Sequence, residues 1–221
     1  MKYSAFVPIK KISTRLPNKN FLLLSGKPLH NWVIETLNHC SSIDEIIIDT
    51  DSLEIKKFYN NKKYPKIKIL LRPDHLKEGS TSMNKIIEYR LKDFKNENII
   101  HTHVTNPLLT LNTIQMAKEK YEEGLRKHFD SLFSVTSLYK RMYFKNKPVN
   151  HNPKNLLPTQ DLIPVQEENA ILYIFSKRSF SKTKNRIGKK PILFEMNMLE
   201  SIDIDYKEEF LLADLLLSKN K

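Results

Sequence analysis

The sequence predicts a single α/β domain built on a mostly parallel β-sheet with helices on its faces. Short apolar runs, typical of strands buried on both sides, alternate with polar segments that have a helical period. This alternation implies crossover connections, which join parallel strands in one sheet. A chain of 221 residues, 40% of them hydrophobic, is suited to one sizeable core rather than two. We therefore expect one domain over residues 1–221, with ligands bound at the carboxyl ends of the strands.

The predicted elements follow one another in a regular order up to about residue 135. The first apolar run, Tyr3–Ile9, precedes a helix that begins at Leu29, where apolar residues recur every three to four positions. The isoleucines of Glu45–Asp51 form a continuous apolar run that ends in acidic and hydroxyl residues, as expected for a buried strand ending at a site. The other predicted strands are Ile67–Leu71, Ile99–Val104, Asp130–Val135, Ile171–Phe175 and Pro191–Glu195, and the other predicted helices are Leu53–Tyr59, Ser82–Leu91, Thr113–Glu123 and the amphipathic Lys207–Leu217.

Residues 139–168 interrupt this alternation. Pro148, Pro153, Pro158 and Pro164, together with asparagines and aromatic residues, mark an irregular segment. Such a segment is too long to be an idle loop in a compact domain. We expect an arm or a flap.

Composition limits the classes of protein to which the chain can belong. Cys40 is the single cysteine, so no internal disulfide can form, and its place in a helical pattern predicts a buried filler in a reducing compartment. The amino-terminal apolar run is too short for a signal peptide, and no stretch approaches membrane-spanning length. The formal charge of +12 is scattered over nearly every segment, which argues for small anionic substrates or compositional drift and against nucleic acid. We expect a cytoplasmic protein that binds neither membrane nor nucleic acid.

The turn after the first strand, Lys10–Asn20, is the first candidate site. It offers backbone donors, a hydroxyl group and several cations at the carboxyl edge of the sheet, where a polyphosphate could bind. A solvated basic loop would have the same composition, because lysine is abundant throughout the chain. Walker-A and dinucleotide fingerprints need several glycines in one short turn, and the chain has only 4 in all.

The carboxylate pair Asp203 and Asp205 is the second candidate site. In an extended segment both side chains point to the same face, so both could bind one magnesium ion. The alternative is that Asp205 caps the last helix, since Glu208 and Glu209 follow as in a capping box. The spacing alone leaves both interpretations open.

His101 and His103 share a face of the same predicted strand. Two histidines at this spacing could bind zinc, but no third ligand lies at a telling distance along the chain. A core or substrate-contact role is the simpler interpretation.

Several segments, taken together, resemble a known family. The amino-terminal Pro8–Asn20 is followed in order by Gly26–Leu29, Arg72–Leu76, Thr105–Leu108, Gln160–Leu162, Glu168–Asn169 and Ser201–Asp205. In order and approximate spacing they resemble the motifs of the acylneuraminate (CMP-sialic acid) cytidylyltransferases and of their relatives that activate 3-deoxy-octulosonate. The resemblance implies a Rossmann-like sheet of the nucleotide-diphospho-sugar transferase type.

The resemblance also implies an activity and a set of residues. A member of this family transfers CMP from CTP to the anomeric hydroxyl of an acidic sugar (a sialic-acid-like nonulosonate), releases pyrophosphate, requires Mg²⁺ and serves surface glycan biosynthesis. It forms a homodimer, in which the arm, residues 139–168, reaches the partner's site. The implied nucleotide-binding residues are Lys10, Ser13, Arg15, Lys19, Asn20, Arg72 and Ser82. The implied acceptor-binding residues are His103, Thr105, Gln160 and Asn169. The implied catalytic residues are Lys10, Lys19, Asp203 and Asp205, of which the two aspartates are also the implied metal ligands.

Some positions depart from the family pattern. Lys10 stands where the family usually has arginine, and it lacks the bidentate fork that arginine presents to phosphate. His103, Leu109 and the pair Pro158–Thr159 also differ, on the side that the acceptor occupies. A different nucleotide or acceptor, such as a sugar phosphate, and a non-catalytic nucleotide-binding homologue are therefore the alternatives.

Overall fold

The structure, a computed structural model, describes residues 1–60 and 64–219. Its strands are β1 (Tyr3–Ile9), β2 (Leu23–Leu24), β3 (Lys27–Pro28), β4 (Ile43–Thr50), β5 (Ile67–Leu71), β6 (Asn98–Thr102), β7 (Ser131–Leu138), β8 (Tyr143–Phe144), β9 (Lys147–Pro148), β10 (Val165–Ser176) and β11 (Pro191–Glu195). Its helices are α1 (Leu29–His39), α2 (Leu53–Tyr59), α3 (Met83–Arg90), α4 (Leu111–Arg126), α5 (Lys177–Thr183) and α6 (Lys207–Ser218).

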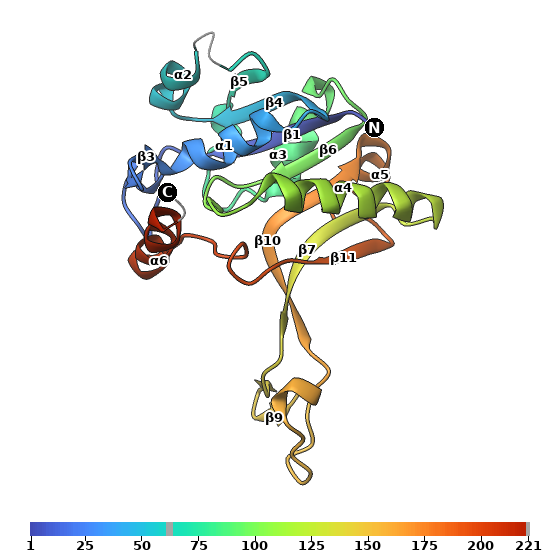
Figure 1. Cartoon of the computed structure of the whole chain (residues 1–221). Coiled ribbons are helices and arrows are strands. Elements are labelled where there is room, and N and C mark those ends of the chain that lie inside the picture. Colours follow the sequence, from blue (N-terminus) through green and yellow to red (C-terminus); the bar gives the residue numbers. More distant parts are fainter. Residues whose placement is uncertain (61–63, 220–221) are drawn as a thin grey trace.

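The centre of the fold is a seven-stranded sheet with the order β11-β7-β10-β6-β1-β4-β5 (Figure 1). Only β10 runs antiparallel to its neighbours, β6 and β7, and the other neighbouring strands are parallel. The chain moves outward from β1 to β4 and β5 and then returns to β6 on the other side of β1. Such a reversal opens a crevice at the carboxyl ends of the strands. The expected mostly parallel sheet with flanking helices is confirmed.

Helices cover both faces of the sheet. Val33 of α1 and Ile114 of α4 pack into the larger core cluster, and Ile86 of α3 and Phe180 of α5 pack into a second cluster. These apolar contacts with the sheet hold the two helical layers in place. Side-chain caps fix helix starts, as at Thr110, whose hydroxyl accepts a hydrogen bond from the backbone N–H of Thr113 at the start of α4.

Most elements lie within a few residues of their predicted positions, including β11 and α6, and the main differences are at β10 and α5. The bounds predicted for β1, α2 and β5 coincide with those observed. β10 begins at Val165, six residues before the predicted start at Ile171. The sequence reading also missed α5, which is short and polar and begins where the Ser176 hydroxyl accepts from the backbone N–H of Ser179. Residues 165–170 of β10 and the whole of α5 lack the apolar run or periodicity on which the prediction depended.

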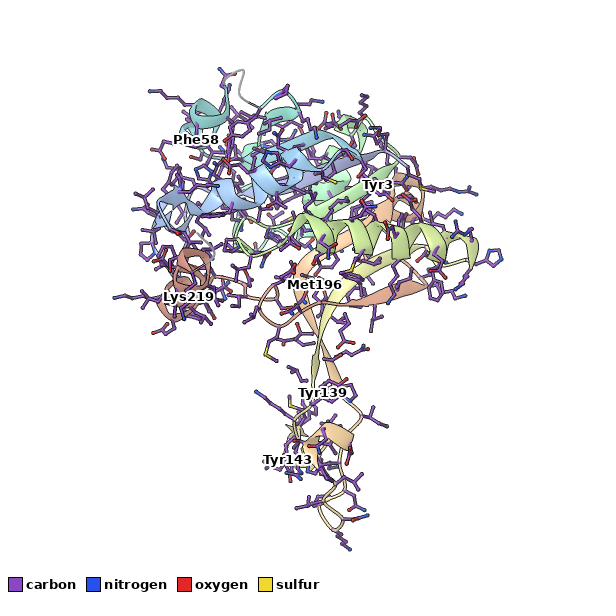
Figure 2. All side chains as sticks on the ribbon, viewed as in Figure 1. Tyr3, Phe58, Tyr139, Tyr143, Met196 and Lys219 are labelled. Carbon is purple, nitrogen blue, oxygen red and sulfur yellow. The ribbon has the colours of Figure 1, made fainter. Side chains whose placement is uncertain are left out.

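The segment between β7 and β10 forms an arm that projects from the body of the molecule (Figure 1). Its base is a two-stranded ribbon in which Val165 pairs with Leu138, so residues 165–168 belong to β10 and the irregular part is shorter than residues 139–168. The hairpin β8–β9 lies farther out, where Figure 2 labels Tyr143. Tyr143 is 59% exposed and its neighbour Phe144 is 68% exposed. The arm therefore presents apolar side chains to solvent.

The composition predicted a buried Cys40 and no membrane-spanning segment. Cys40 is free and buried in the larger core cluster, as a filler residue would be. Within residues 1–60 and 64–219, no helix has the length and apolar character needed to cross a membrane.

Candidate active site

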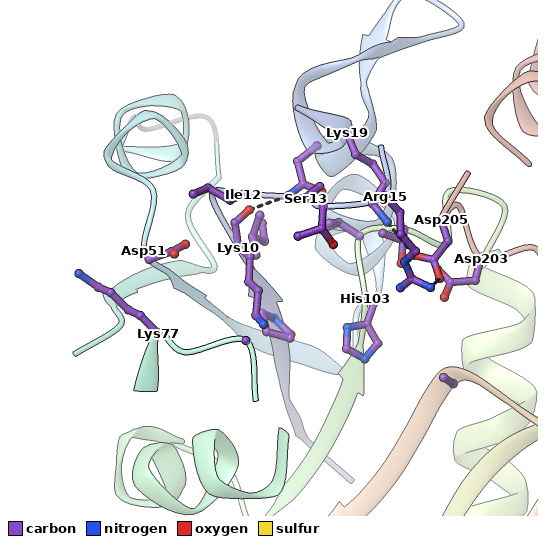
Figure 3. A pocket seen from close by; sticks show the side chains of 18 residues that line it. Lys10, Ile12, Ser13, Arg15, Lys19, Asp51, Lys77, His103, Asp203 and Asp205 are labelled. Atoms are coloured by element: carbon purple, nitrogen blue, oxygen red, sulfur yellow. Dashed lines mark hydrogen bonds and ion pairs between the residues drawn. The ribbon is translucent and has the colours of Figure 1, made fainter. Parts of the chain in front are cut away.

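A cavity of about 680 Å³ lies at the carboxyl ends of β6, β1 and β4 (Figure 3). His103, Lys10 and Asp51 directly follow these three strands and line the cavity. Asp203 and Asp205 join them from the loop before α6. The volume is within the range of ligand pockets, and the cavity occupies the crevice that the reversal of strand order creates.

The Lys10–Asn20 turn forms one wall of this cavity. The side-chain amide of Asn20 donates to the carbonyl oxygen of Lys10 over 2.8 Å, which ties the end of the turn to its beginning. The backbone N–H of Lys11 donates to Oδ1 of Asp51 over 2.6 Å, which fixes the turn to the end of β4. Lys10, Ser13, Arg15, Lys19 and Asn20 all line the cavity, so the structure brings these predicted nucleotide-binding residues together. The turn is a built wall of the site rather than a free basic loop.

Lys19 and Asp205 link the two ends of the chain. Nζ of Lys19 donates to Oδ1 of Asp205 over 2.9 Å and to the carbonyl oxygen of Ile204 over 2.5 Å. Nη1 of Arg15 lies 2.7 Å from Oδ2 of Asp205 (Figure 3). Lys19 is only 8% exposed, so its ammonium group is held in one place. The carboxylate of Asp205 is thus shared between a buried and an exposed cation.

Asp203 lies beside Asp205, but its carboxylate makes longer contacts with neighbouring residues. Nδ2 of Asn106 is 3.4 Å from Oδ1 of Asp203, and the backbone N–H of Ile204 donates to the carbonyl oxygen of Thr105 over 2.9 Å. Burial raises the pKa of Asp203, and the charge of Asp205 adds to that effect, while a hydrogen bond from Thr105 and the charge of Lys19 oppose it. A carboxylate in this position gains from an additional cation.

The capping alternative for Asp205 is wrong. The residue before α6 is Tyr206, and Oε2 of Glu209 accepts hydrogen bonds from the backbone N–H groups of Tyr206 (2.6 Å) and Asp205 (2.8 Å). Glu209 therefore accepts from the backbone of the N-cap residue Tyr206, and Asp205 is not the capping residue. This leaves the carboxylate of Asp205 to face the cavity.

His103 presents an uncharged ring to the cavity. Burial lowers the pKa of His103 to about 4, and the nearby charges of Arg186 and Lys19 lower it further, while Asp205 acts in the opposite direction. The His101 ring lies behind it, with the two ring centroids 4.6 Å apart. Burial also lowers the pKa of His101 well below its usual value. Both imidazoles are neutral at physiological pH.

Arg72 does not line the cavity. It is 2% exposed, and its Nε donates to Oδ1 of Asp49 over 2.5 Å, while Nε of Arg90 donates to Oδ2 of the same carboxylate over 2.8 Å. Nη1 of Arg72 has no hydrogen-bond partner among the described residues. Its implied contact with the nucleoside stays a prediction.

Ser82 and Gln160 also lie outside the cavity lining. The hydroxyl of Ser82 caps α3 by accepting from the backbone N–H of Lys85 over 3.4 Å. Gln160 is exposed on the arm in the short 3-10 turn Thr159–Asp161. Their implied contacts with nucleotide and acceptor stay predictions.

Thr105 lines the cavity, whereas Asn169 lines a neighbouring pocket that shares Asp203 and Asp205 with it. Oδ1 of Asn169 accepts from the hydroxyl of Ser134 (2.5 Å) and from the backbone N–H of Ile171 (3.2 Å). Its Nδ2 donates to the hydroxyl oxygens of Thr136 (3.1 Å) and Ser201 (3.2 Å). The amide of Asn169 therefore fastens the loop before Asp203 to the sheet.

The sequence reading missed Ala170 and Lys77, which also line the cavity. Ala170 has a φ of 59°, a left-handed conformation, at the irregularity in the pairing of β10 with β7. A bulge of this kind turns the backbone toward the site. No sequence signal marks it, because an alanine gives no sign of a left-handed backbone.

The family model described as "Cytidylyltransferase" matches residues 5–220. The N-acylneuraminate cytidylyltransferase of Streptococcus agalactiae is 23% identical over 218 residues, which are 96% of this chain and 52% of that protein. The pseudaminic acid cytidylyltransferase of Campylobacter jejuni is 28% identical over 141 residues, or 62% of this chain and 59% of that protein. The chain thus spans about half the length of the curated relatives it matches.

Solved structures show the same fold at low identity. CMP:2-keto-3-deoxy-manno-octonic acid synthetase, solved with CTP, superimposes over the whole of both chains with a TM-score of 0.71 and 13% identity. The 4-diphosphocytidyl-2C-methyl-D-erythritol synthase of Anaerococcus prevotii gives a TM-score of 0.66 with 15% identity, over 98% of this chain and 96% of that one. These likenesses confirm the fold, and the family match extends over nearly the whole sequence. The chain therefore belongs to the cytidylyltransferase family.

Proposed function

We propose that this chain transfers CMP from CTP to the anomeric hydroxyl of an acidic, sialic-acid-like nonulosonate and releases pyrophosphate. The observation that carries the proposal is the meeting of Lys10, Lys19, Asp203 and Asp205 in one cavity. Cations there suit a triphosphate, and the carboxylates suit a divalent metal. The names of the curated relatives, which are N-acylneuraminate and pseudaminic acid cytidylyltransferases, support this class of acceptor.

The Lys10–Asn20 turn is proposed to hold the triphosphate. Lys19 is the fixed cation, since burial and two hydrogen bonds hold its ammonium group. Arg15 is the mobile one, because its side chain is 54% exposed and can turn from Asp205 to a phosphate. Lys10 and the hydroxyl of Ser13 complete the wall. Phosphoryl-type transfer depends mainly on positioning and charge neutralisation, which these groups provide.

Magnesium is the proposed cofactor, with Asp203 and Asp205 as its protein ligands. The donor set fits: Mg²⁺ is usually bound by one or two carboxylates, and substrate phosphates and water complete its shell. No group of three or more metal-binding side chains occurs in the part of the chain that the structure describes. When bound, the ion would neutralise charge on the phosphates.

The chain's own groups can carry the remaining steps. The acceptor hydroxyl attacks the α-phosphorus directly, so no protein nucleophile is required. The neutral ring of His103 lines the cavity and can accept the hydrogen of that hydroxyl. Lys19 and Lys10 stabilise the departing pyrophosphate. Arg72 and Ser82 are proposed to contact the nucleoside after local rearrangement.

We further propose a cytoplasmic homodimer that serves surface glycan biosynthesis. The arm carries exposed Tyr143, Phe144 and Ile163, and an apolar projection of this kind is typical of an interface. In such a dimer Gln160 would reach the acceptor of the partner's site. The exposed position of Gln160, outside the cavity of its own chain, supports this arrangement.

The test is pyrophosphate release from each of the four ribonucleoside triphosphates, with magnesium, against a panel of nonulosonates, octulosonates and sugar phosphates. Release with CTP and a nonulosonate is the expected result. Release with another nucleotide or with a sugar phosphate would assign a different transferase reaction. No release, with CTP still raising the melting temperature, would indicate a nucleotide-binding homologue without this activity.

A further inference from the structure

We infer that Arg186, stacked on Tyr173 next to His101, forms an anion-binding subsite that receives a carboxylate of the acceptor. The inference rests on the proposed function, because it assigns part of the site to the acidic sugar. Arg186 lies in the segment after α5 and was not among the residues singled out in the sequence. It would determine acceptor specificity rather than bind the nucleotide.

The backbone around Arg186 is held against α3. The backbone N–H of Arg186 donates to Oδ1 of Asn84 over 3.2 Å, and Nδ2 of Asn84 lies 3.2 Å from Oδ1 of Asn185. Asn84 belongs to the first turn of α3, so a segment from the carboxyl-terminal half is fixed to a helix from the amino-terminal half. Arg186 therefore has a defined position although it lies outside helices and strands.

The guanidinium group is oriented by aromatic neighbours. Its carbon lies 3.9 Å from the ring centroid of Tyr173, and Nη2 donates to the Tyr173 hydroxyl over 3.1 Å. That hydroxyl in turn donates to Oε1 of Glu168 over 2.5 Å. Burial raises the pKa of Tyr173, so the phenol keeps its proton and can accept from Arg186 while it donates to Glu168. The chain of hydrogen bonds runs in one direction and fixes the guanidinium plane.

The positive charge of Arg186 has no carboxylate partner within 4.0 Å in the described part of the chain. By contrast, Arg15, Arg72 and Arg90 each form an ion pair with an aspartate. Arg186 is half-buried, so water solvates it only in part. Of its five N–H donors, one is used by Tyr173, and Nη1 makes only a 3.5 Å contact with Nδ1 of His101. A fixed guanidinium with free donors and no counter-ion is a receptor for a carboxylate.

Arg186 does not itself line the cavity, and two histidines connect it to the cavity wall. The His101 ring, which Arg186 contacts, lies 4.6 Å from the His103 ring, and His103 lines the cavity. Among charged groups, Arg186 is the one that most strongly lowers the pKa of His103. Both imidazoles are neutral, so they add no charge that would compete for the anion. Arg186 thus supplies positive charge close to His101 and His103.

The triphosphate is a poor candidate for this subsite. Its proposed cations come from the Lys10–Asn20 turn, whereas Arg186 comes from the segment between α5 and β11 and contacts His101. An anion here would be carried by the second substrate. The planar carboxylate of an acidic sugar matches the two-pronged geometry of a guanidinium.

The experiment compares Arg186→Gln, Arg186→Lys and a matched control, Arg178→Gln, whose side chain is exposed on α5 and does not line the cavity. The acceptor is the acidic sugar that wild-type protein uses best, tested beside its neutral carboxamide. Because a charge-assisted hydrogen bond contributes roughly 10- to 100-fold in affinity, Arg186→Gln should raise the acceptor KM by about that factor, with the KM for CTP within about twofold of wild type. Arg186→Lys, which keeps the charge but loses the fork, should be intermediate. Arg178→Gln should match wild type.

The carboxamide separates recognition of charge from a structural role. Wild-type protein should prefer the carboxylate to the carboxamide by roughly the same factor, and Arg186→Gln should lose that preference. An acceptor KM that stays at the wild-type value in Arg186→Gln, or an equal rise in the KM for CTP, would overturn this inference and leave the proposed function intact. Failure of wild-type protein to use any acidic sugar would overturn both.

Discussion

Replacing Asp205 with alanine is the most direct test of the proposed metal site, since this carboxylate also joins the two ends of the chain. Its two oxygens contact Nζ of Lys19 (2.9 Å) and Nη1 of Arg15 (2.7 Å). In the variant the carbonyl oxygen of Ile204 would be the remaining partner of Lys19 in the described structure. We expect turnover to be abolished while the fold stays cooperative.

The loss of stability can be estimated from the two ion pairs. Lys19 is 8% exposed, and leaving a nearly buried charged donor without its charged partner costs about 1–3 kcal/mol. The Arg15 side chain is 54% exposed, so its pair with Asp205 adds between zero and about 1 kcal/mol. At about 2–4 °C per kcal/mol for a domain of this size, the melting temperature should fall by several degrees. Removal of one transition-state contact lowers kcat by roughly 10²- to 10³-fold, and loss of a metal ligand adds to that.

The assay is pyrophosphate release at saturating CTP and magnesium, together with thermal melting followed by circular dichroism. Asp205→Asn, which keeps an oxygen near Lys19 but removes the charge, should lose turnover with a smaller change in melting temperature. Glu123→Gln is the matched control, because Glu123 forms an exposed i,i+4 ion pair with Lys127 away from the cavity. Wild-type turnover in Asp205→Ala would refute the metal assignment, and an unchanged melting temperature would refute the proposed contribution of Asp205 to stability.

Three further predictions concern the turn, a buried histidine and the arm. Lys10→Arg should keep or raise CTP affinity measured by calorimetry, since arginine adds a bidentate fork, and a loss above about tenfold would mean that the turn binds phosphate differently. Burial lowers the pKa of His30 to about 4, whereas a histidine in the unfolded chain has a pKa of about 6.5. The imidazole of His30 therefore binds a proton less readily in the folded protein than in the unfolded chain. The free energy of unfolding should therefore fall as the pH drops from about 6.5 to 4, and His30 should contribute up to about 3 kcal/mol of that fall. Urea titrations at several pH values measure it. His30→Phe should make the dependence of stability on pH shallower, whereas a change at exposed His39 should not. Phe144→Ser should shift a homodimer toward monomer in light scattering, and an unchanged mass would count against the arm as the interface.

The sequence predicted the parallel sheet and the main cavity groups because their signals are local. Lys10, Lys19 and Asp203 each follow a recognisable pattern of strand end, basic turn or carboxylate pair. The direct contact of Lys19 with Asp205 could not be derived, since these residues are 186 positions apart in the sequence and the contact depends on the packing of the whole chain. The capping alternative failed for a local reason, because the helix starts one residue later than Asp205 would require, with Tyr206 as its N-cap.

The buried arginines illustrate a second limit of the sequence. Arg72 follows β5 and has the sequence context of a site-facing residue, but Asp49 binds it across the neighbouring strand. That contact depends on the register in which Asp49 pairs with Leu70, and register is a property of the assembled sheet. No pattern in the sequence marks Arg186 as a site residue, since it is a single arginine in a polar segment without hydrophobic periodicity.

Under the proposed function, the contacts of Asp205 imply that nucleotide binding would change the site as well as fill it. In the structure Asp205 neutralises Lys19 and Arg15, the same cations that a triphosphate would need. A phosphate arriving at Lys19 would meet the charges of Asp203 and Asp205, and like charges in a partly buried cavity repel strongly. A divalent cation shared by the carboxylates and the phosphates would remove that repulsion. It would neutralise Asp205 in place of Lys19 and Arg15, which would then bind the phosphates. Under the proposed function, the same carboxylate that orders the turn in the free protein would therefore make nucleotide affinity depend on the metal, and this coupling would account for the presence of two aspartates beside the cations.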